Sequence, residues 1–291
     1  MERFVAGLID VFAETPLTGN PLAIVEAADA LSDEQLRRIA REFNQAETTF
    51  IMRSSRADRK LRSFTASGAE VFGAGHNALG AWLWMAAHGD LGALERPQVF
   101  RQEIGAEVLP ITLERRDGQI HGRMTQSPLK LSDPFTAVAP LADALALRVE
   151  DICTTPEPRV ADTGAGHLQV RLRDNATVDR ARPSAEKLLD VLAAAGAEGC
   201  YIYAFDPSAP QRAYARFFNP TVGLWEDAAT GTAAGPLCAY LGSLGMLAAD
   251  NALVVEQGAR MGRRSALRVQ LAPDPELSGS GIVVLRGEIV L

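Results

Sequence analysis

The chain has 291 residues, of which 47% are hydrophobic, and its 29 Lys and Arg against 36 Asp and Glu give a formal net charge of -7. This composition is typical of a globular protein of about two domains, large enough to bury its core without disulfides or metal ions. The basic residues are scattered, which disfavours a nucleic acid or an acidic membrane surface as a partner.

The three cysteines, Cys153, Cys200 and Cys238, are odd in number and form no close pair. This pattern predicts a reducing, cytoplasmic location and no metal site. Asp10 and Glu14 interrupt the first apolar segment before it reaches the length of a signal-peptide core, and no stretch reaches the roughly 18 apolar residues of a membrane span. We therefore expect no association with a membrane.

The first half of the chain predicts strands at residues 5–12 and 22–25 around a tight loop, and a helix at 33–43. The helix follows a Ser-Asp-Glu-Gln start and has apolar residues at spacings of three and four. Further strands are expected at 48–52 and 60–65, and a hairpin at 108–113 and 119–124 with Asp117-Gly118 at its turn.

Residues 126–134 are rich in turn residues, so we expect turns and a domain boundary there. The predicted domains are 1–127 and 128–281, with the C-terminal strand 282–291 as a candidate to complete the first. In the second half, a helix is expected at 185–195 and strands at 167–172, 201–205, 213–218, 254–257, 266–271 and 282–290.

An internal repeat relates residues 64–87 to residues 218–241. Each segment runs from a strand end through a polar loop and a Gly-rich entry into a helix that is apolar on nearly every side. Such a helix must be enclosed by other structure. We therefore expect two similar α+β domains, each with a curved mixed or antiparallel sheet wrapped around a central helix whose N-terminus opens on a shared cleft.

The two helix entries, residues 73–75 and 230–232, contain small residues that let an anion approach the unpaired N–H groups of a helix N-terminus. A small carboxylate could be bound from both sides, although glycines there could also serve only tight turns and packing. Gly73-x-Gly75-x-x-Ala78 also matches a loose dinucleotide fingerprint, but no βαβ continuation with its acidic residue is evident.

Three side chains are candidates for chemistry. Glu47 borders an apolar-rich strand, and partial burial would suit its carboxyl to general acid/base work, whereas a solvated strand-edge Glu is the alternative. His76 falls in the first turn of its helix, where the dipole favours the neutral ring, but it could be a packing residue. Asp227 precedes the other helix, either as a cap or as a substrate contact.

Several ordered blocks along the chain together resemble one family. The blocks are Asp10-Val11-Phe12 with Thr18-Gly19-Asn20-Pro21-Leu22-Ala23, Asn44-Gln45-Ala46-Glu47-Thr48-Thr49-Phe50, Phe72-Gly73-Ala74-Gly75-His76, Arg216-Phe217-Phe218, Glu226-Asp227-Ala228-Ala229-Thr230-Gly231-Thr232-Ala233, and Gln257-Gly258 to Arg263-Arg264-Ser265. On these blocks the chain resembles the PhzF-like phenazine-biosynthesis isomerases, which have the diaminopimelate-epimerase fold. The resemblance implies two pseudo-symmetric domains, an active site between them, a homodimer and no cofactor.

By this resemblance, Glu47 is the acid/base that moves a proton between carbon atoms of a small carboxylic acid such as trans-2,3-dihydro-3-hydroxyanthranilate. His76 and Asp227 are the catalytic partners that orient and protonate groups on it. Gly75, Asn77, Gly231 and Thr232 are the expected substrate-binding residues, with backbone N–H groups around the two glycines holding the carboxylate.

Related amino-acid epimerases use two facing cysteines, at positions that correspond to Ala74 and Thr230 here. Neither side chain can form a thiolate, which leaves one-base chemistry. The chain departs from the family pattern at Asn77-Ala78 and at Ala228, where proline is usual, and this should loosen or re-aim both turns. A non-catalytic carboxylate-binding protein of the same fold and a nicotinamide-dependent oxidoreductase are the alternative functions.

Overall fold

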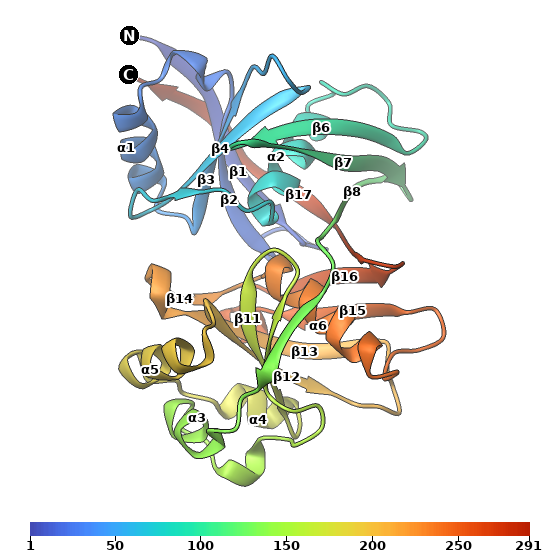
Figure 1. Ribbon diagram of the computed structural model, residues 1–291. Coiled ribbons are helices and arrows are strands. Elements are labelled where there is room, and N and C mark those ends of the chain that lie inside the picture. Colours follow the sequence, from blue (N-terminus) through green and yellow to red (C-terminus); the bar gives the residue numbers. More distant parts are fainter. The chain divides into compact units, whose positions relative to one another are not determined.

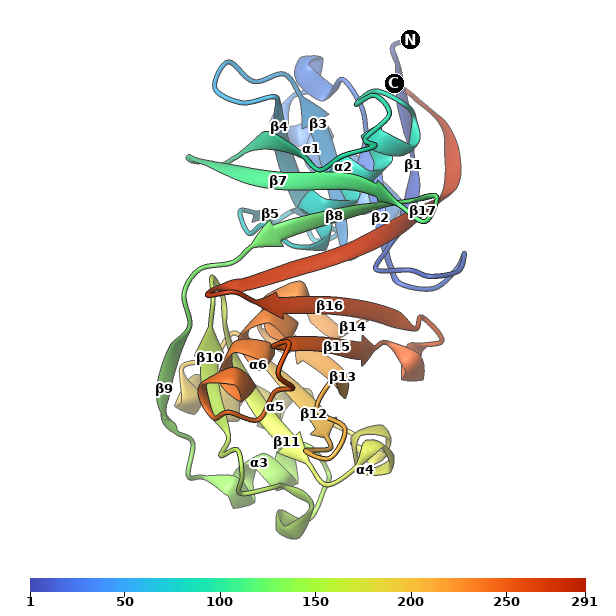
Figure 2. The ribbon, with the colours of Figure 1, turned by 90° about the vertical axis from the view of Figure 1, so that its right-hand side faces the viewer.

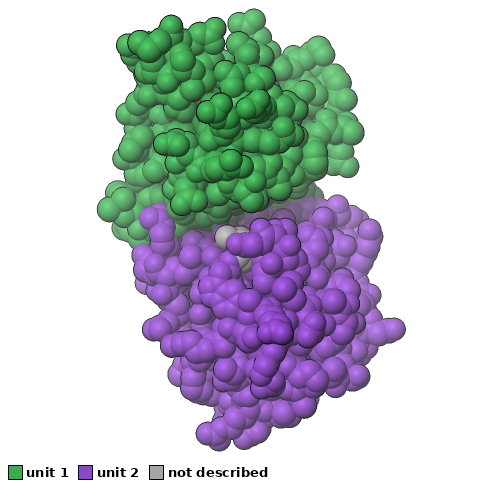
Figure 3. Space-filling model, turned by 90° about the vertical axis from the view of Figure 1, so that its left-hand side faces the viewer, with its two compact units in different colours: residues 1–125, 278–291 green, residues 126–277 purple. Residues whose placement is uncertain are grey.

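The computed structural model describes residues 1–291, apart from the side chain of Leu224. The chain divides into two compact units, which Figure 3 distinguishes by colour. Unit 1 comprises residues 1–125 and 278–291, and unit 2 comprises residues 126–277. The domain limits expected from the sequence stay a prediction.

Unit 1 contains most of the strands and both helices expected in the first half. Its elements are β1 (Arg3–Val11), β2 (Asn20–Val25), α1 (Asp33–Phe43), β3 (Glu47–Met52), β4 (Arg59–Thr65), β5 (Glu70–Val71), α2 (His76–Ala87), β6 (Gln98–Ile104), β7 (Glu107–Arg116), β8 (Gln119–Thr125) and most of β17 (Pro275–Val290). The predicted helix at 33–43 and the hairpin of β7 and β8 are confirmed.

Parallel and antiparallel pairs alternate through unit 1. β1 and β2 are antiparallel, β2 and β3 are parallel around α1, β3 and β4 are antiparallel, β4 and β6 are parallel around α2, and β6, β7 and β8 form an antiparallel meander. β17 returns to pair with β1, from Arg3 opposite Val290 to Val11 opposite Gly281 (Figure 2). The two ends of the chain are therefore bonded side by side in one sheet.

Helix α2 is the core of unit 1 and lies against β1, β2, β3 and β8 (Figure 1). All its residues except Ala87 are buried. Gly80 allows the close approach, because a Cβ atom there would lie 2.5 Å from a methyl carbon of Leu22 and 2.7 Å from one of Val11. The enclosed apolar helix predicted from the sequence is confirmed.

Unit 2 begins within the connection that follows β8. Its elements are β9 (Lys130–Pro134), α3 (Val138–Ala144), β10 (Arg159–Asp162), β11 (Gly166–Leu172), α4 (Asn175–Arg180), α5 (Ala185–Ala195), β12 (Gly199–Phe205), β13 (Arg212–Asn219), β14 (Leu224–Asp227), α6 (Gly231–Ser243), β15 (Ala252–Gln257) and β16 (Ser265–Leu271). The predicted helix at 185–195 is confirmed to the residue.

The pairing order of unit 2 repeats that of unit 1. β10 and β11 are antiparallel, β11 and β12 are parallel around α4 and α5, β12 and β13 are antiparallel, β13 and β15 are parallel around α6, and β15 and β16 are antiparallel. Most of α6 is buried, as α2 is. The predicted pair of α+β domains, each a curved mixed sheet around a central helix, is confirmed.

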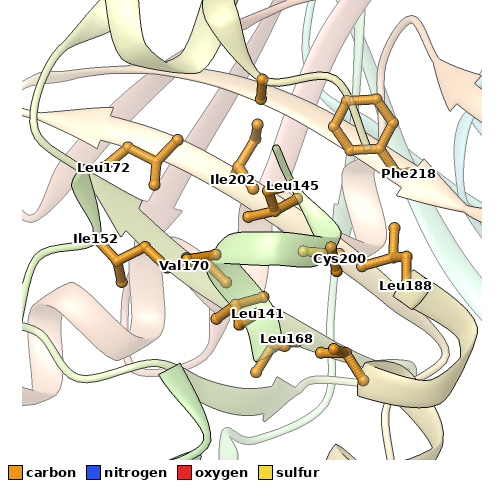
Figure 4. Packing of buried hydrophobic residues seen from close by; sticks show 14 of the residues in the cluster. Leu141, Leu145, Ile152, Leu168, Val170, Leu172, Leu188, Cys200, Ile202 and Phe218 are labelled. Carbon is orange, nitrogen blue, oxygen red and sulfur yellow. The ribbon is translucent and has the colours of Figure 1, made fainter. Parts of the chain in front are cut away.

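The two faces of β11 have different roles. Leu168, Val170 and Leu172 point to an apolar layer with α3 and α5, where Leu141 and Leu188 join them (Figure 4). The alternate residues of the strand face α6 instead, because successive side chains of a strand point to opposite faces. This alternation brings polar side chains of β11 to the central helix.

Two expectations for the connections are wrong. The segment 126–134 was expected to be turns, but residues 130–134 form β9, which pairs antiparallel with β10. Ser132 Oγ also accepts a hydrogen bond from the Val160 N–H at 3.0 Å. A partner strand nearly 30 residues away supplies these bonds, so local turn residues could not reveal them. Strand β6 was not expected either. Because β6 pairs parallel with β4, α2 does lie in a βαβ unit, which is not evident from the sequence.

Candidate functional site

The entry to α6 in unit 2 is organised around Asp227, the last residue of β14. Its Oδ2 accepts a hydrogen bond of 2.6 Å from the hydroxyl of Thr230, the N-cap residue of α6. Both residues are buried: Asp227 is 6% exposed and Thr230 is 7% exposed. Asp227 is thus fixed at the helix entry through a hydroxyl group.

Gln257, at the end of β15, binds the same loop through both ends of its amide. Its Oε1 accepts from the Thr230 N–H at 3.2 Å and from the Tyr201 hydroxyl at 2.9 Å. Its Nε2 donates to the Asp227 carbonyl at 2.8 Å and to the Thr230 hydroxyl at 3.0 Å. Gln257 and Tyr201 are fully buried, and burial raises the pKa of Tyr201 well above its ordinary value, with the charge of Asp227 adding to the shift.

The first turn of α6 carries Thr232, whose hydroxyl lies 3.1 Å from Nε2 of His167 on β11. His167 packs edge-on against Phe217, with 4.8 Å between ring centroids. Burial lowers the pKa of His167 to about 4, so the ring is neutral at physiological pH. Gly231, the residue before Thr232, is held through its carbonyl, which accepts from Gln126 Nε2 at 2.9 Å.

The matching entry to α2 in unit 1 is held by Asn77. Its Oδ1 accepts from the Gly75 N–H at 2.8 Å, and its Nδ2 donates to the Gly73 carbonyl at 2.9 Å and to Ser63 Oγ at 3.1 Å. These bonds fix the loop at the position where the family pattern has proline. The Gly75 N–H is engaged within the protein, so the N–H groups that follow it are better suited to an incoming anion.

His76 is the first residue of α2 and is only 8% exposed. Burial lowers its pKa to about 4. Burial thus favours the neutral ring that the sequence led us to expect. Its Nε2 is buried and has no hydrogen-bond partner among the described residues.

Glu47 opens β3 opposite Thr65 of β4. The residue is half-buried and its Oε2 atom is buried, as the apolar strand beside it predicts. Its strand is tied to the α2 entry, because Thr49 Oγ1 lies 2.9 Å from Ser63 Oγ, which in turn accepts from Asn77. The carboxyl group is thus presented from a strand that is bonded to the loop before α2.

The expected site residues fall into two groups by unit. Glu47, Gly75, His76 and Asn77 belong to unit 1, and Asp227, Gly231 and Thr232 belong to unit 2. Within the first group, one direct hydrogen bond joins the Gly75 N–H to Asn77 Oδ1.

Sequence reasoning gave no role to four residues of unit 2, namely Gln126, His167, Tyr201 and Gln257. His167 could have been found as one of the polar residues that alternate with Leu168 and Val170 on a largely buried strand. Gln257 stands in the last block of the family resemblance. No local pattern distinguishes Tyr201, because its strand β12 is buried along its whole length.

Among the residues that the structure describes, no group of three or more His, Cys, Asp or Glu side chains could hold a metal ion. The helices within the same described residues include none that is long and apolar enough to cross a membrane.

Comparison with known proteins identifies the family. The model of the family described as "Phenazine biosynthesis-like protein" (PhzC-PhzF) matches residues 9–290. The trans-2,3-dihydro-3-hydroxyanthranilate isomerase of Pseudomonas aeruginosa is 32% identical over 298 residues, which cover 100% of both chains. The structure of a Bacillus anthracis phenazine biosynthesis protein of the PhzF family is 25% identical, with a TM-score of 0.89 and 100% of both chains covered.

The fold extends to more distant proteins. A hydroxyproline epimerase from Agrobacterium vitis is 13% identical, with a TM-score of 0.68, and the match covers 99% of this chain and 91% of that one. This likeness places the chain in the epimerase-like fold. With the family match along nearly its whole length and curated relatives named as isomerases, the chain belongs to the phenazine biosynthesis-like (PhzC-PhzF) family and is an isomerase.

Proposed function

We propose that this isomerase moves a proton between two carbon atoms of a small carboxylic acid resembling trans-2,3-dihydro-3-hydroxyanthranilate, with Glu47 as the single acid/base. The substrate class is supported by the name of the P. aeruginosa relative, which matches the chain from end to end. The observation that carries the chemistry is the half-buried carboxyl group of Glu47 in a protein with no thiol at either helix entry.

The proposed step conserves protons and electrons. The Glu47 carboxylate removes a proton from one carbon, and the electron pair of that C–H bond moves into the conjugated system of the substrate. Glu47, now a carboxylic acid, returns the proton to another carbon, so that a double bond changes place and Glu47 regains its starting form. His76 and Asp227 orient and protonate polar groups of the substrate in this proposal.

The cysteines support one-base rather than two-thiol chemistry. Ala74 and Thr230 stand at the two helix entries where the related epimerases have thiols. Cys200 and Cys238 lie elsewhere and are buried, and burial raises the pKa of each thiol to about 12. Neither would be a thiolate at neutral pH, and the thiolate is the reactive form.

Binding of the substrate carboxylate is proposed at the N-termini of α2 and α6, near Gly75, Asn77, Gly231 and Thr232. The first N–H groups of a helix lack partners within the helix and lie at the positive end of its dipole. The Thr232 hydroxyl adds a side-chain donor on α6 in the tautomer of His167 whose Nε2 carries the proton and donates to it. The enzyme is proposed to need no cofactor, and a cytoplasmic homodimer stays a prediction from the sequence.

Deuterium uptake tests the role of Glu47. The wild type, Glu47→Gln and the control Glu34→Gln, which alters an exposed residue of α1, are incubated in D₂O with a panel of cyclic and unsaturated carboxylic acids that includes dihydro-hydroxyanthranilate. Mass spectrometry then measures deuterium bound to carbon. Glu47→Gln should lower the uptake rate by about 10² to 10⁴-fold, the usual contribution of a positioned acid/base, and Glu34→Gln should not.

Unchanged uptake in Glu47→Gln would rule out the proposed role. A ligand that binds both the wild type and Glu47→Gln but takes up no deuterium would favour the non-catalytic carboxylate-binding alternative. NAD(P)H fluorescence titration in the same samples tests the oxidoreductase alternative, for which we expect no change in signal.

A further inference from the structure

The amide of Gln257 has only one possible orientation. Its Oε1 lies against the N–H of Thr230, which can only donate, and its Nε2 lies against the carbonyl of Asp227, which can only accept. Exchanging the two amide atoms would make both contacts repulsive. The Tyr201 hydroxyl must therefore donate to Oε1.

This orientation also fixes the hydroxyl proton of Thr230. Gln257 Nε2 donates to Thr230 Oγ1, so the single proton of that hydroxyl is available for its other contact, the bond to Asp227 Oδ2. Hydrogen bonds are therefore donated from Gln257 to Thr230 and from Thr230 to Asp227, and no other assignment of the protons satisfies these contacts. A carboxyl oxygen that accepts such a bond is the unprotonated oxygen of the group.

We propose that Thr230 and Gln257 are positioning residues that hold Asp227 Oδ2 as a permanent acceptor, so that Oδ2 takes no part in proton exchange with the substrate. This inference rests on the function proposed for Asp227 above. The hydroxyl that occupies the thiol position of the related epimerases would thus act through a neighbouring carboxylate rather than on the substrate.

The charged and titratable groups around Asp227, Thr230 and Gln257 are compatible with this fixed direction of hydrogen-bond donation. Tyr201 on β12 stays protonated because burial and the charge of Asp227 raise its pKa. The neighbouring Glu226 on β14 is paired with Arg216 on β13, at 2.8 Å. A hydrogen bond to the charged form of a carboxyl favours that form, so the Thr230 bond should keep Asp227 ionised to lower pH.

The test compares Thr230→Val, which removes the hydroxyl at nearly constant volume, with Thr230→Ser, which restores it. NMR of ¹³C-labelled aspartate carboxyl groups follows the titration midpoint of Asp227 in the full chain, with the signal assigned by its loss in Asp227→Asn. We expect the midpoint to rise by about one pH unit in Thr230→Val and to return to the wild-type value in Thr230→Ser. Deuterium uptake should fall about 10-fold or more in Thr230→Val through kcat, with KM changed less than about twofold.

An unchanged midpoint in folded Thr230→Val would overturn the proposal, even if the variant were less stable. If Thr230→Val does not fold, Tyr201→Phe removes only the far donor, and we expect a smaller rise of the midpoint in that variant; no rise would also contradict the proposal. The titration needs no turnover, so a wild-type protein that shows the expected midpoints but no deuterium uptake would contradict the proposed function and not the positioning of Asp227.

Discussion

Arg216 donates from Nε and Nη2 to the two carboxylate oxygens of Glu226, at 2.8 and 2.9 Å. Arg62 does the same to Glu70, at 2.7 and 2.8 Å. Each arginine stands two residues before a phenylalanine and lies over its ring. The Arg62–Glu70 pair joins β4 to β5, the short strand before α2. The Arg216–Glu226 pair joins β13 to β14, the short strand before α6. The repeat therefore includes an Arg–Glu pair that fixes the loop before α2 and before α6.

The two Arg–Glu pairs should contribute unequally to stability. Glu226→Gln leaves the guanidinium of Arg216, which is only 7% exposed, without its charged partner. We expect the free energy of unfolding to fall by about 3 kcal/mol, as for other broken buried pairs. Glu70→Gln should cost less, because Arg62 is 19% exposed and keeps Asp33 as a partner. Urea denaturation measures both, and equal losses would contradict this ranking.

Stability should decrease in mild acid because of two histidines. The pKa of His76 and of His167 is lowered to about 4 by burial, against 6.5 for the ordinary group. As the pH falls from 6.5 to 4, the unfolded chain binds protons that the folded chain does not, so each buried ring reduces the free energy of unfolding by up to about 3 kcal/mol.

Urea denaturation at pH 7 and pH 5 checks this dependence. His76→Gln and His167→Gln should each reduce the difference in free energy between the two pH values, and His88→Gln, which changes a half-buried ring, serves as the control. A pH dependence that is the same in all three variants would show that other groups cause it.

Thiol reagents should have little effect on the native enzyme. Cys200 and Cys238 are buried with a pKa of about 12, and burial also raises the pKa of the half-buried Cys153. We expect slow modification of Cys153 alone at pH 7.5, modification of all three in urea, and no loss of deuterium uptake after treatment with iodoacetamide. Rapid inactivation would point to a thiol in the reaction.

Gly235 on α6 makes room for the side chain of Gln126. A Cβ atom at Gly235 would lie 1.7 Å from Gln126 Oε1, and this amide also bonds Thr163 and the Gly231 carbonyl. Gly235→Ala should therefore displace Gln126 and lower the free energy of unfolding by about 1–3 kcal/mol.

The double variant Gly235→Ala/Gln126→Ala tests whether this displacement is the cause. It should lose less free energy of unfolding than the sum of the two single variants, because the clash is absent. Additive losses, measured by urea denaturation, would mean that the Cβ atom disturbs other contacts.

Local signals in the sequence were sufficient for some elements. Helix α1 is preceded by Ser32, whose side chain forms a capping box with Gln35, and ends at Asn44 in the left-handed conformation. Helix α5 ends at Gly196, which is also left-handed. Such start and stop residues act within one turn of the helix, so the sequence predicted both ranges correctly.

The elements that the sequence missed depend on distant partners. β9 has no buried residue and is a strand through its pairing with β10. In the same way, Asp227 could be found from its place before a helix, but its bond to Thr230 and the role of Gln257, 30 residues later, required the folded sheet. A single sequence contains no signal that joins these positions.

The pairing of β17 with β1 bears on how the chain folds during synthesis. Unit 2 is complete once residue 277 has been made, whereas unit 1 takes its last strand from residues 278–291. Unit 1 is therefore the first unit to be started in synthesis and the last to be completed. The edge of β1 that pairs with β17 stays unpaired until all of unit 2 has been synthesised. Removal of the last few residues would leave this edge of β1 permanently unpaired. We therefore expect a shortened chain to aggregate through β1, with the fold of unit 2 retained.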